Sequence, residues 1–332
     1  MAEPWRSGVN YRKLGKSGLT VSEIGLGAYL TYGEKLDFAS SQRCIRRAFD
    51  LGINLFDTAD VYAKGEAERF LGRALKEFPR NRIVLATKCF FPMSEDPNDR
   101  GLSRKHIVES VERSLNNLQG ETVDLFQCHR FDSETPLEET LQVLGDLVRQ
   151  GKILYWGVSR WSQQQMGEAV RLCGQLHSPL PISNQVPYNI LYRECEAGIL
   201  PACEELGIGV LAYAPLAQGV LTGKYSGGHI PQGSRASDPH REKGMYDMSR
   251  ETLAKVDRLK TLAREMGLPL AQLALAWCLR RSTVSSVLMG ATRPEQIEEN
   301  MLASGLRLTQ EILHRIDEIL VLGRQEAPCR SN

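Results

Sequence analysis

The chain has 332 residues, of which 42% are hydrophobic and 24% charged, and its formal net charge at pH 7 is +1. This balance argues against nucleic acid or an anionic membrane surface as the main partner. The sequence shows no membrane-spanning apolar run, no signal peptide, and no C-x-x-C or metal-ligand spacing among its eight cysteines, so we expect a cytoplasmic protein with reduced thiols and no bound metal.

Strand-like and helix-like segments alternate along most of the chain. A short hairpin closed by a Gly/Ser turn is expected over residues 11–21. Later strands are expected to begin near Ile24, Asn54, Ile83, Leu125, Leu154, Ile182, Gly209 and Ser286. Most of these starts are about 30 residues apart, which is the size of one βα unit.

Amphipathic helices are expected between these strands. They cover residues 40–51, 66–77, 103–118, 136–150, 162–176, 194–206 and 270–281. Gly52, Gly151 and Gly207 follow three of the helices, as helix C-termini prefer. Ser103 and Ser162 are suitable N-caps.

Eight strands, each followed by a helix, favour a (β/α)8 TIM barrel over an open doubly wound sheet. The G-x-G at Gly25 and Gly27 is not a dinucleotide fingerprint, because Leu30 stands where the third glycine would be. We therefore expect one α/β domain over residues 1–332, with the N-terminal β-hairpin as a cap on the barrel.

The interval between the seventh and eighth strands is longer than the others. It contains a loop rich in Gly, Pro and Ser at residues 226–244 and then an additional helix at residues 249–266. Long loops inside a compact domain are usually functional, and in a barrel this one would lie at the active-site face.

Four polar side chains lie at or just beyond the ends of three successive strand-like segments. Asp57 and Tyr62 follow the segment that starts near Asn54, Lys88 ends the next segment, and His129 ends the third. Each residue alone has an ordinary structural explanation, such as a turn cap, a rim aromatic, a solvated strand end or a buried imidazole. Because parallel barrel strands end at one mouth, the four together favour an acid–base site.

The four residue types suit the reduction of a carbonyl group. A phenol with a pKa near 10 is a poor acid unless its phenolate is stabilised, which a Lys88 cation oriented by Asp57 would do. His129 could hydrogen-bond the substrate carbonyl or help Tyr62 exchange its proton. Since no side chain supplies a hydride, the reaction requires a nicotinamide cofactor.

Motifs over nearly the whole chain resemble the aldo-keto reductase family. Segments similar to its strand-end motifs are 52–59, 157–159 and 184–185. Segments that look most like its branch of potassium-channel β-subunits and bacterial reductase relatives are 156–162, 214–219, 223–225 and 287–292. The resemblance implies a catalytic tetrad of Asp57, Tyr62, Lys88 and His129, NADPH (NADP+) held in extended form along the barrel mouth, and a homo-oligomer, tetrameric or larger.

The resemblance also implies cofactor residues after strands five to eight. Those near the nicotinamide are Ser159, Arg160, Asn184, Gln185 and Tyr213, whose ring could stack on it. Those near the pyrophosphate are Ala214, Pro215, Leu216, Gln218, Gly219, Lys224 and Arg235. Gly290 and Thr292 precede a helix that begins near Pro294, whose N-terminus suits the adenosine 2′-phosphate. Residues that can reach the adenine are Gln296, Glu299 and Asn300.

Two positions depart from the channel-subunit pattern. The family histidine is commonly asparagine in those subunits, and the presence of His129 favours turnover over cofactor sensing. Tyr213 stands where that branch often has tryptophan. Thr292 and Arg293, with no acidic residue beside them, favour NADPH over NADH.

The expected walls of a substrate pocket lie just beyond the strand ends and are Tyr29, Tyr32, Phe90, Phe91, Arg130 and Trp161. The aromatic rings suggest aldehydes or ketones with an apolar or planar body, and we favour a small 2-oxoaldehyde or an aromatic aldehyde. Arg130 could recognise a carboxylate or phosphate, or it could pair with Asp132 or Glu134; both readings remain open.

The preferred interpretation is therefore NADPH-dependent reduction of a small carbonyl substrate, with Tyr62 as general acid. The first alternative is an NADP(H)-binding redox-sensing subunit with slow turnover. A second is a lyase that forms a Schiff base on Lys88, although an Asp57 partner would keep that lysine charged. A non-enzymatic scaffold would require the four-residue convergence to be chance.

Overall fold

The structure is a computed structural model that describes residues 8–237 and 247–321. Strands β1 and β2 form an antiparallel hairpin, and strands β3 to β10 form a closed parallel barrel. The hairpin strands are β1 (Tyr11–Lys13) and β2 (Thr20–Ser22). The barrel strands are β3 (Ile24–Gly27), β4 (Leu55–Asp57), β5 (Val84–Cys89), β6 (Val123–Cys128), β7 (Ile153–Ser159), β8 (Ser183–Pro187), β9 (Gly209–Tyr213) and β10 (Val284–Met289).

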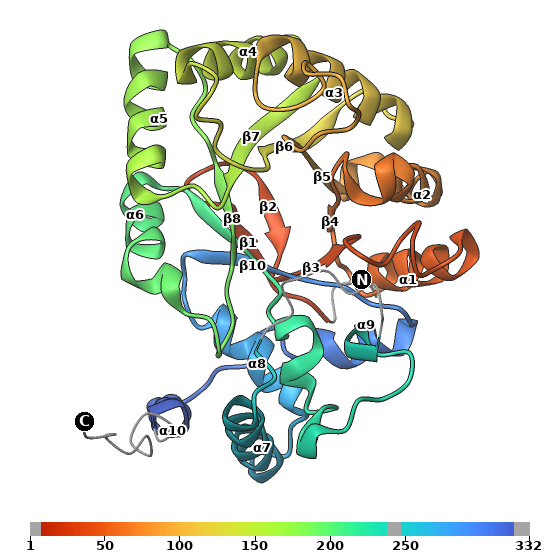
Figure 1. Cartoon of the computed structure of the whole chain (residues 1–332), viewed down its shortest axis with the longest axis vertical. Helices are drawn as coiled ribbons and strands as arrows, with labels where there is room; N and C mark the ends of the chain where they lie inside the picture. The colour runs from red at the N-terminus through yellow and green to blue at the C-terminus, as the bar shows by residue number, and fades with distance from the viewer. Residues whose placement is uncertain (1–7, 238–246, 322–332) are drawn as a thin grey trace, which may run out of the picture.

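The barrel closes because β10 pairs in parallel with both β3 and β9. Helices surround the strands in chain order (Figure 1). They are α1 (Phe38–Asp50), α2 (Glu66–Leu75), α3 (Arg104–Leu118), α4 (Leu137–Arg149), α5 (Gln163–Leu176), α6 (Ile199–Leu206), α7 (Arg250–Glu265), α8 (Leu270–Leu279), α9 (Pro294–Met301) and α10 (Gln310–Val321). The predicted (β/α)8 barrel is confirmed.

Strand starts differ from the predicted positions by no more than two residues, and both predicted N-caps are observed. The Ser103 side chain accepts from the backbone N–H of His106, and Ser162 forms a capping box with Gln165. One predicted helix, residues 194–206, is wrong as a continuous element. It is a 3-10 helix, Glu194–Ala197, followed after Gly198 by α6. Pro201 in the first turn of α6 explains the break, because a proline ring clashes with the carbonyl four residues earlier.

The hairpin caps the amino-terminal end of the barrel, as predicted. Leu14 and Val21 pack with the apolar residues that point into the barrel, among them Leu55, Ala86 and Leu125. The hairpin turn lies so close to the start of β9 that a Cβ on Gly15 would meet the Gly207 carbonyl oxygen at 2.3 Å. Glycine, with a φ of +60° here, is therefore required by both space and backbone conformation.

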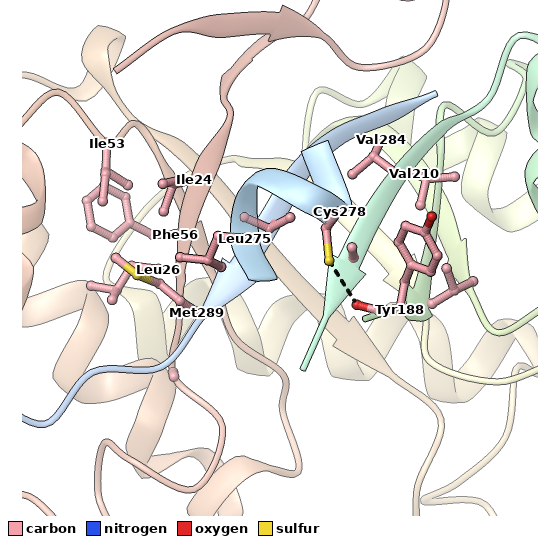
Figure 2. Close-up of a cluster of buried hydrophobic side chains, with 14 of the residues drawn as sticks. Ile24, Leu26, Ile53, Phe56, Tyr188, Val210, Leu275, Cys278, Val284 and Met289 are labelled. Carbon is pink, nitrogen blue, oxygen red and sulfur yellow. Dashed lines mark hydrogen bonds between the residues drawn. The ribbon is translucent and has the colours of Figure 1, made fainter. Parts of the chain in front are cut away.

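A second, larger apolar layer lies between the strands and the helices. Figure 2 shows part of it, where Leu26, Phe56 and Met289 from three strands face Leu275 and Cys278 of α8. Burial raises the pKa of the Cys278 thiol, and the seven described cysteines are all buried and unpaired. These thiols are packing groups.

The additional helix predicted between the last two strands is α7. The preceding loop is described only to residue 237, and residues 238–244 of the predicted segment lie outside the described residues. Within the described ranges, no helix is long and apolar enough to cross a membrane, and no group of three or more His, Cys, Asp or Glu residues could hold a metal ion.

Candidate active site

Strand alternation directs the candidate acid–base residues into one end of the barrel. On β5, Val84 and Ala86 belong to the barrel interior, so Lys88 shares their face, while Leu85 and Cys89 pack outward. The same period places Asp57 on the face of Leu55 and His129 on the face of Leu125. All three polar residues are therefore at the carboxyl ends of parallel strands, where TIM-barrel active sites lie.

The loop after β4 keeps Tyr62 at the same end of the barrel as Asp57, Lys88 and His129. Its backbone continues the pairing with β5, since Thr58 N donates to Ala86 O at 2.9 Å and Asp60 N donates to Lys88 O at 3.1 Å. Tyr62 then begins a 3-10 helix in which Ala63 and Lys64 have φ values of 48° and 51°. This left-handed turn is uncommon for non-glycine residues and is typical of functional loops.

Lys88 connects the carboxylate to the phenol. Its Nζ donates to Asp57 Oδ2 at 2.6 Å and to Thr58 O at 2.7 Å, and it lies 3.5 Å from the Tyr62 hydroxyl. The other Asp57 oxygen accepts from Gln185 Nε2 at 2.8 Å. Lys88 is fully buried, so this ion pair is shielded from solvent.

His129 completes the group, with its ring centroid 5.8 Å from that of Tyr62. The structure thus brings Asp57, Tyr62, Lys88 and His129 together, as their positions in the sequence suggested. Burial, then the charges of Lys88 and Arg130, hold the pKa of His129 well below its usual value. The imidazole is therefore neutral at neutral pH.

The expected lowering of the Tyr62 pKa is not observed in the protein alone. Burial is the largest influence and raises the pKa of the phenol well above its usual value, and the Asp57 charge adds to the increase. Burial also lowers the pKa of Lys88, against the opposing effect of Asp57. Because burial and the Asp57 charge both oppose ionisation, Tyr62 remains a protonated phenol.

Aromatic side chains border the tetrad at the barrel mouth. The Tyr29 ring lies 4.9 Å from that of Tyr62 and is 43% exposed. The Phe91 ring lies edge-on to His129 at 4.9 Å, and Arg130 Cζ is 5.1 Å from the Phe91 ring centroid. These residues occupy positions from which they can contact a substrate.

The other predicted wall residues pack in or against the apolar layer between the strands and the helices. Phe90 contacts Phe91 at 5.4 Å between ring centroids and also packs on the outer apolar layer. Tyr32 and Trp161 are 1% and 0% exposed and belong to that layer, where Trp161 packs edge-on against Phe131. In this structure Tyr32 and Trp161 are therefore packing residues and present no exposed surface at the mouth.

Of the five predicted nicotinamide ligands, Ser159 and Gln185 face the barrel interior and Asn184 does not. Ser159 Oγ donates to Gln185 O at 3.0 Å, and the Gln185 side chain reaches Asp57. Asn184 points outward, where its Nδ2 donates to Trp161 O at 3.0 Å. Adjacent strand residues cannot both face inward, so the assignment of Asn184 to the cofactor does not fit its placement.

The predicted cofactor loops contain an unusual share of left-handed backbone. Non-glycine residues with positive φ in these loops are Arg160, Ala214, Ala217 and Gln218. Pro215 and Leu216 form the turn after β9, and a Cβ on Gly219 would lie 2.8 Å from Lys224 Cε. Such backbone turns its N–H groups toward one side and can form an anion-binding concavity.

After β10, Thr292 and Gln296 are joined across the first turn of α9. The backbone N–H of Thr292 donates to Gln296 Oε1 at 2.8 Å. Further along the helix, Asn300 is buried, with Nδ2 3.5 Å from Met289 Sδ, and Glu299 is exposed. Arg235 lies in a 3-10 turn before the undescribed segment, and burial lowers its pKa.

Sequence reasoning missed two buried polar residues beside the tetrad. Gln127 shares the inward face of β6 with His129, and its Nε2 lies 3.4 Å from Asp57 Oδ1. Asp60 is fully buried, accepts from Ser110 Oγ at 2.9 Å, and has one carboxyl oxygen without a partner in the described residues. Alternation from Leu125 could have identified Gln127, whereas no local pattern indicates that Asp60 is buried.

The buried Asp60 carboxyl makes stability pH-dependent. Burial raises its pKa from 3.8 to about 7 in the folded protein. Between these values the folded state holds a proton that the unfolded state has released, so this group lowers the free energy of unfolding as pH rises. Asp60→Asn cannot ionise and should gain stability relative to wild type as the pH rises from about 4 to about 7, by at most about 1.4 kcal/mol per pH unit.

Thermal unfolding of both proteins across this range checks the prediction. Asp50→Asn, which removes an exposed carboxylate at the end of α1, is the control. A stability difference between Asp60→Asn and wild type that stays constant with pH would show that Asp60 ionises alike in the folded and unfolded states.

A surface hollow of about 620 Å³ lies at the opposite end of the barrel, between the hairpin and the starts of β5 to β7. Its polar lining includes Arg80, Asn81 and Asp124, and Arg80 pairs with Asp124 at 2.8 Å. It contains no tetrad residue. The acid–base group, and not this hollow, is therefore the candidate active site, in keeping with the carboxyl-end location of barrel active sites.

Comparison with known proteins agrees with this geometry. The model of the aldo/keto reductase family matches residues 23–321. A probable voltage-gated potassium channel subunit beta of Oryza sativa subsp. japonica is 42% identical over 318 residues, which cover 94% of this chain and 97% of that protein. One of Arabidopsis thaliana, also named probable, is 43% identical with the same coverage.

A putative voltage-gated potassium channel subunit beta of Schizosaccharomyces pombe is 40% identical over 322 residues, covering 94% of this chain and 93% of that protein. The range matched by the family model contains all eight barrel strands and the four candidate acid–base residues. The resemblance deduced from the strand-end motifs is confirmed, and the chain belongs to the aldo/keto reductase family.

Proposed function

We propose that this protein reduces aldehydes or ketones to alcohols with NADPH and that Tyr62 is the general acid. The observation that carries the proposal is the chain of contacts from Asp57 through Lys88 Nζ to the Tyr62 hydroxyl at the barrel mouth. Membership in the aldo/keto reductase family supports NAD(P)H-dependent oxidoreduction. The buried acid–base group then supplies the proton that a carbonyl reduction requires.

The residues around the mouth fit a nicotinamide dinucleotide. Ser159 and Gln185 face the barrel interior beside the tetrad, where they can hold the carboxamide. Gln218 Oε1 is buried without a partner in the described part of the chain and can accept from a bound group. Thr292 and Arg293 precede α9, whose N-terminus attracts a phosphate, and favour NADPH over NADH. When bound, the cofactor supplies the hydride for the carbonyl carbon.

The tetrad then controls one proton. The substrate carbonyl oxygen accepts hydrogen bonds from the Tyr62 hydroxyl and from the neutral His129 imidazole. As the carbon gains a hydride, the phenol proton moves to that oxygen, and Lys88, 3.5 Å away, stabilises the phenolate that forms. The raised pKa of Tyr62 keeps the proton in place until the oxygen becomes basic.

The second candidate is a subunit that binds NADP(H) and regulates a partner, with slow turnover. The names of the three relatives, each a potassium channel subunit beta, favour it. The presence of His129 within the tetrad favours turnover. Assembly into a homo-oligomer of four or more chains is compatible with either function.

NADPH binding followed by a turnover assay separates the two. We expect a fluorescence titration to show binding, and the near-ultraviolet absorbance of NADPH to fall when an aromatic aldehyde or a 2-oxoaldehyde is added. Tight binding without turnover of any aldehyde would establish the sensing subunit instead. Absence of binding would contradict both functions.

A further inference from the structure

The barrel mouth contains more positive charge than the acid–base chemistry needs. Asp57 and Lys88 form one ion pair. Arg130 follows β6 and Arg160 follows β7, and their charges act on each other and on the tyrosines of the mouth. Among residues 8–237 and 247–321, neither arginine has a carboxylate within ion-pair distance.

Arg130 is held in a defined position beside the reacting groups. Its Nη1 donates to His129 O at 2.5 Å, and its Cζ lies 5.1 Å from the Phe91 ring centroid. A guanidinium has five N–H donors, and this backbone bond uses one of them. The side chain is half-buried, and burial followed by the Arg160 charge lowers its pKa.

The acidic residues next in sequence do not neutralise Arg130. The Asp132 carboxylate accepts from Leu102 N at 2.7 Å, Glu134 N at 2.9 Å and Thr135 Oγ1 at 2.8 Å. These donors account for its lowered pKa, after the opposing effect of burial. Among the described residues, Arg130 therefore forms no ion pair with Asp132 or Glu134, the pairing that the sequence left open.

A half-buried guanidinium without an anionic partner is costly unless something binds it. The Phe91 ring contacts both neighbours, with its centroid 4.9 Å from that of the His129 imidazole and 5.1 Å from Arg130 Cζ. A planar molecule lying on Phe91 can therefore place its carbonyl at the tetrad and a second group at Arg130. The geometry of a guanidinium matches a carboxylate, which it binds through two parallel hydrogen bonds.

We propose that the preferred substrates are aldehydes or ketones that carry a carboxylate, and that Arg130 binds that carboxylate. The proposal rests on the reductase function above and refines its substrate class. The Arg130 guanidinium is a charged group beside the aromatic walls, and it discriminates between substrates that have the same shape but differ in charge. Arg130 is thus a specificity residue, separate from the proton-transfer residues.

The test compares para-carboxybenzaldehyde with its methyl ester, which has the same ring and aldehyde but no charge. The measured quantity is the ratio of kcat/KM for the acid to that for the ester. We expect the wild-type ratio to exceed one and Arg130→Gln to lower it by about 10- to 100-fold, the effect of losing a charge-assisted pair. The loss should appear mainly in KM, because the carboxylate binds alike in ground and transition states.

Two further variants make the result specific to this side chain. Arg130→Lys keeps the charge but not the forked geometry and should recover part of the ratio. Arg171→Gln removes an exposed arginine that pairs with Glu168 on α5 and should leave the ratio unchanged. A wild-type ratio of one or below, or the same ratio in Arg130→Gln as in wild type, would overturn the proposal.

Binding of benzoate, measured by calorimetry in the presence of NADP+, gives a readout without turnover. We expect its affinity to fall in Arg130→Gln and not in Arg171→Gln; equal affinities would contradict the role of Arg130. If neither aldehyde is reduced but benzoate affinity still depends on Arg130, the reductase function fails and the carboxylate site stands. If both aldehydes are reduced and neither the kcat/KM ratio nor the benzoate affinity depends on Arg130, the reductase function stands and the carboxylate site fails.

Discussion

Replacing Tyr62 by phenylalanine is expected to lower kcat for carbonyl reduction by about 10²–10⁴-fold, which is the usual contribution of a positioned general acid. The ring remains, so its contact with Tyr29 and its place over the barrel mouth are kept. Only the hydroxyl near Lys88 Nζ is lost. Steady-state rates with one aldehyde and saturating NADPH measure the effect.

NADPH affinity should remain near the wild-type value in Tyr62→Phe, because the phenol acts on the substrate. Tyr155→Phe is a matched control, since Tyr155 packs with the apolar group at the hairpin end of the barrel. That variant should keep wild-type kinetics. A wild-type kcat in Tyr62→Phe would show that another group donates the proton.

Replacing Lys88 by methionine should affect both rate and stability. Without the cation, the phenolate that forms on Tyr62 loses its stabilising charge, and we expect kcat to fall by about 10²–10³-fold. Asp57 would be left as a buried carboxylate held only by amide donors from Gln127 and Gln185. Removing one partner of a buried ion pair typically costs about 3–5 kcal/mol of unfolding free energy.

A double variant separates the two effects. Asp57→Asn combined with Lys88→Met removes the unpaired charge, so stability should recover while activity stays low. Denaturant unfolding and steady-state kinetics on wild type, Lys88→Met and the double variant measure this. Recovery of activity along with stability would show that the rate loss came from damaged folding and that Lys88 has no direct role with Tyr62.

The burial and hydrogen bonds of Lys88 argue against the lyase alternative. A Schiff base requires a free amine at Lys88, and its Nζ is fully buried with acceptors at 2.6 and 2.7 Å. Borohydride treatment with a carbonyl compound should therefore leave Lys88 unmodified.

Much of the fold followed from local patterns. The spacing of the strands indicated a barrel whose strand ends converge, and the position of Lys88 at the end of its segment indicated that it lies at this mouth. Glycine and serine signals located helix ends, such as Ser103 and Ser162. The prediction of one helix over 194–206 was wrong because the apolar period continues across Gly198. The helical backbone is interrupted there, since Pro201 can be accommodated only in the first turn of a new helix.

The sequence by itself determined which residues end each strand, because side-chain alternation and helix signals act between near neighbours. Only the tertiary structure decided what surrounds those residues. Trp161 lies two residues past β7 and Asn184 lies within β8 beside Gln185, yet both face the helix layer. The raised pKa of Tyr62 and the absence of a carboxylate beside Arg130 depend on burial and on charges from several strands. Burial and electrostatic potential are sums over the whole packed barrel, so no short stretch of sequence contains them.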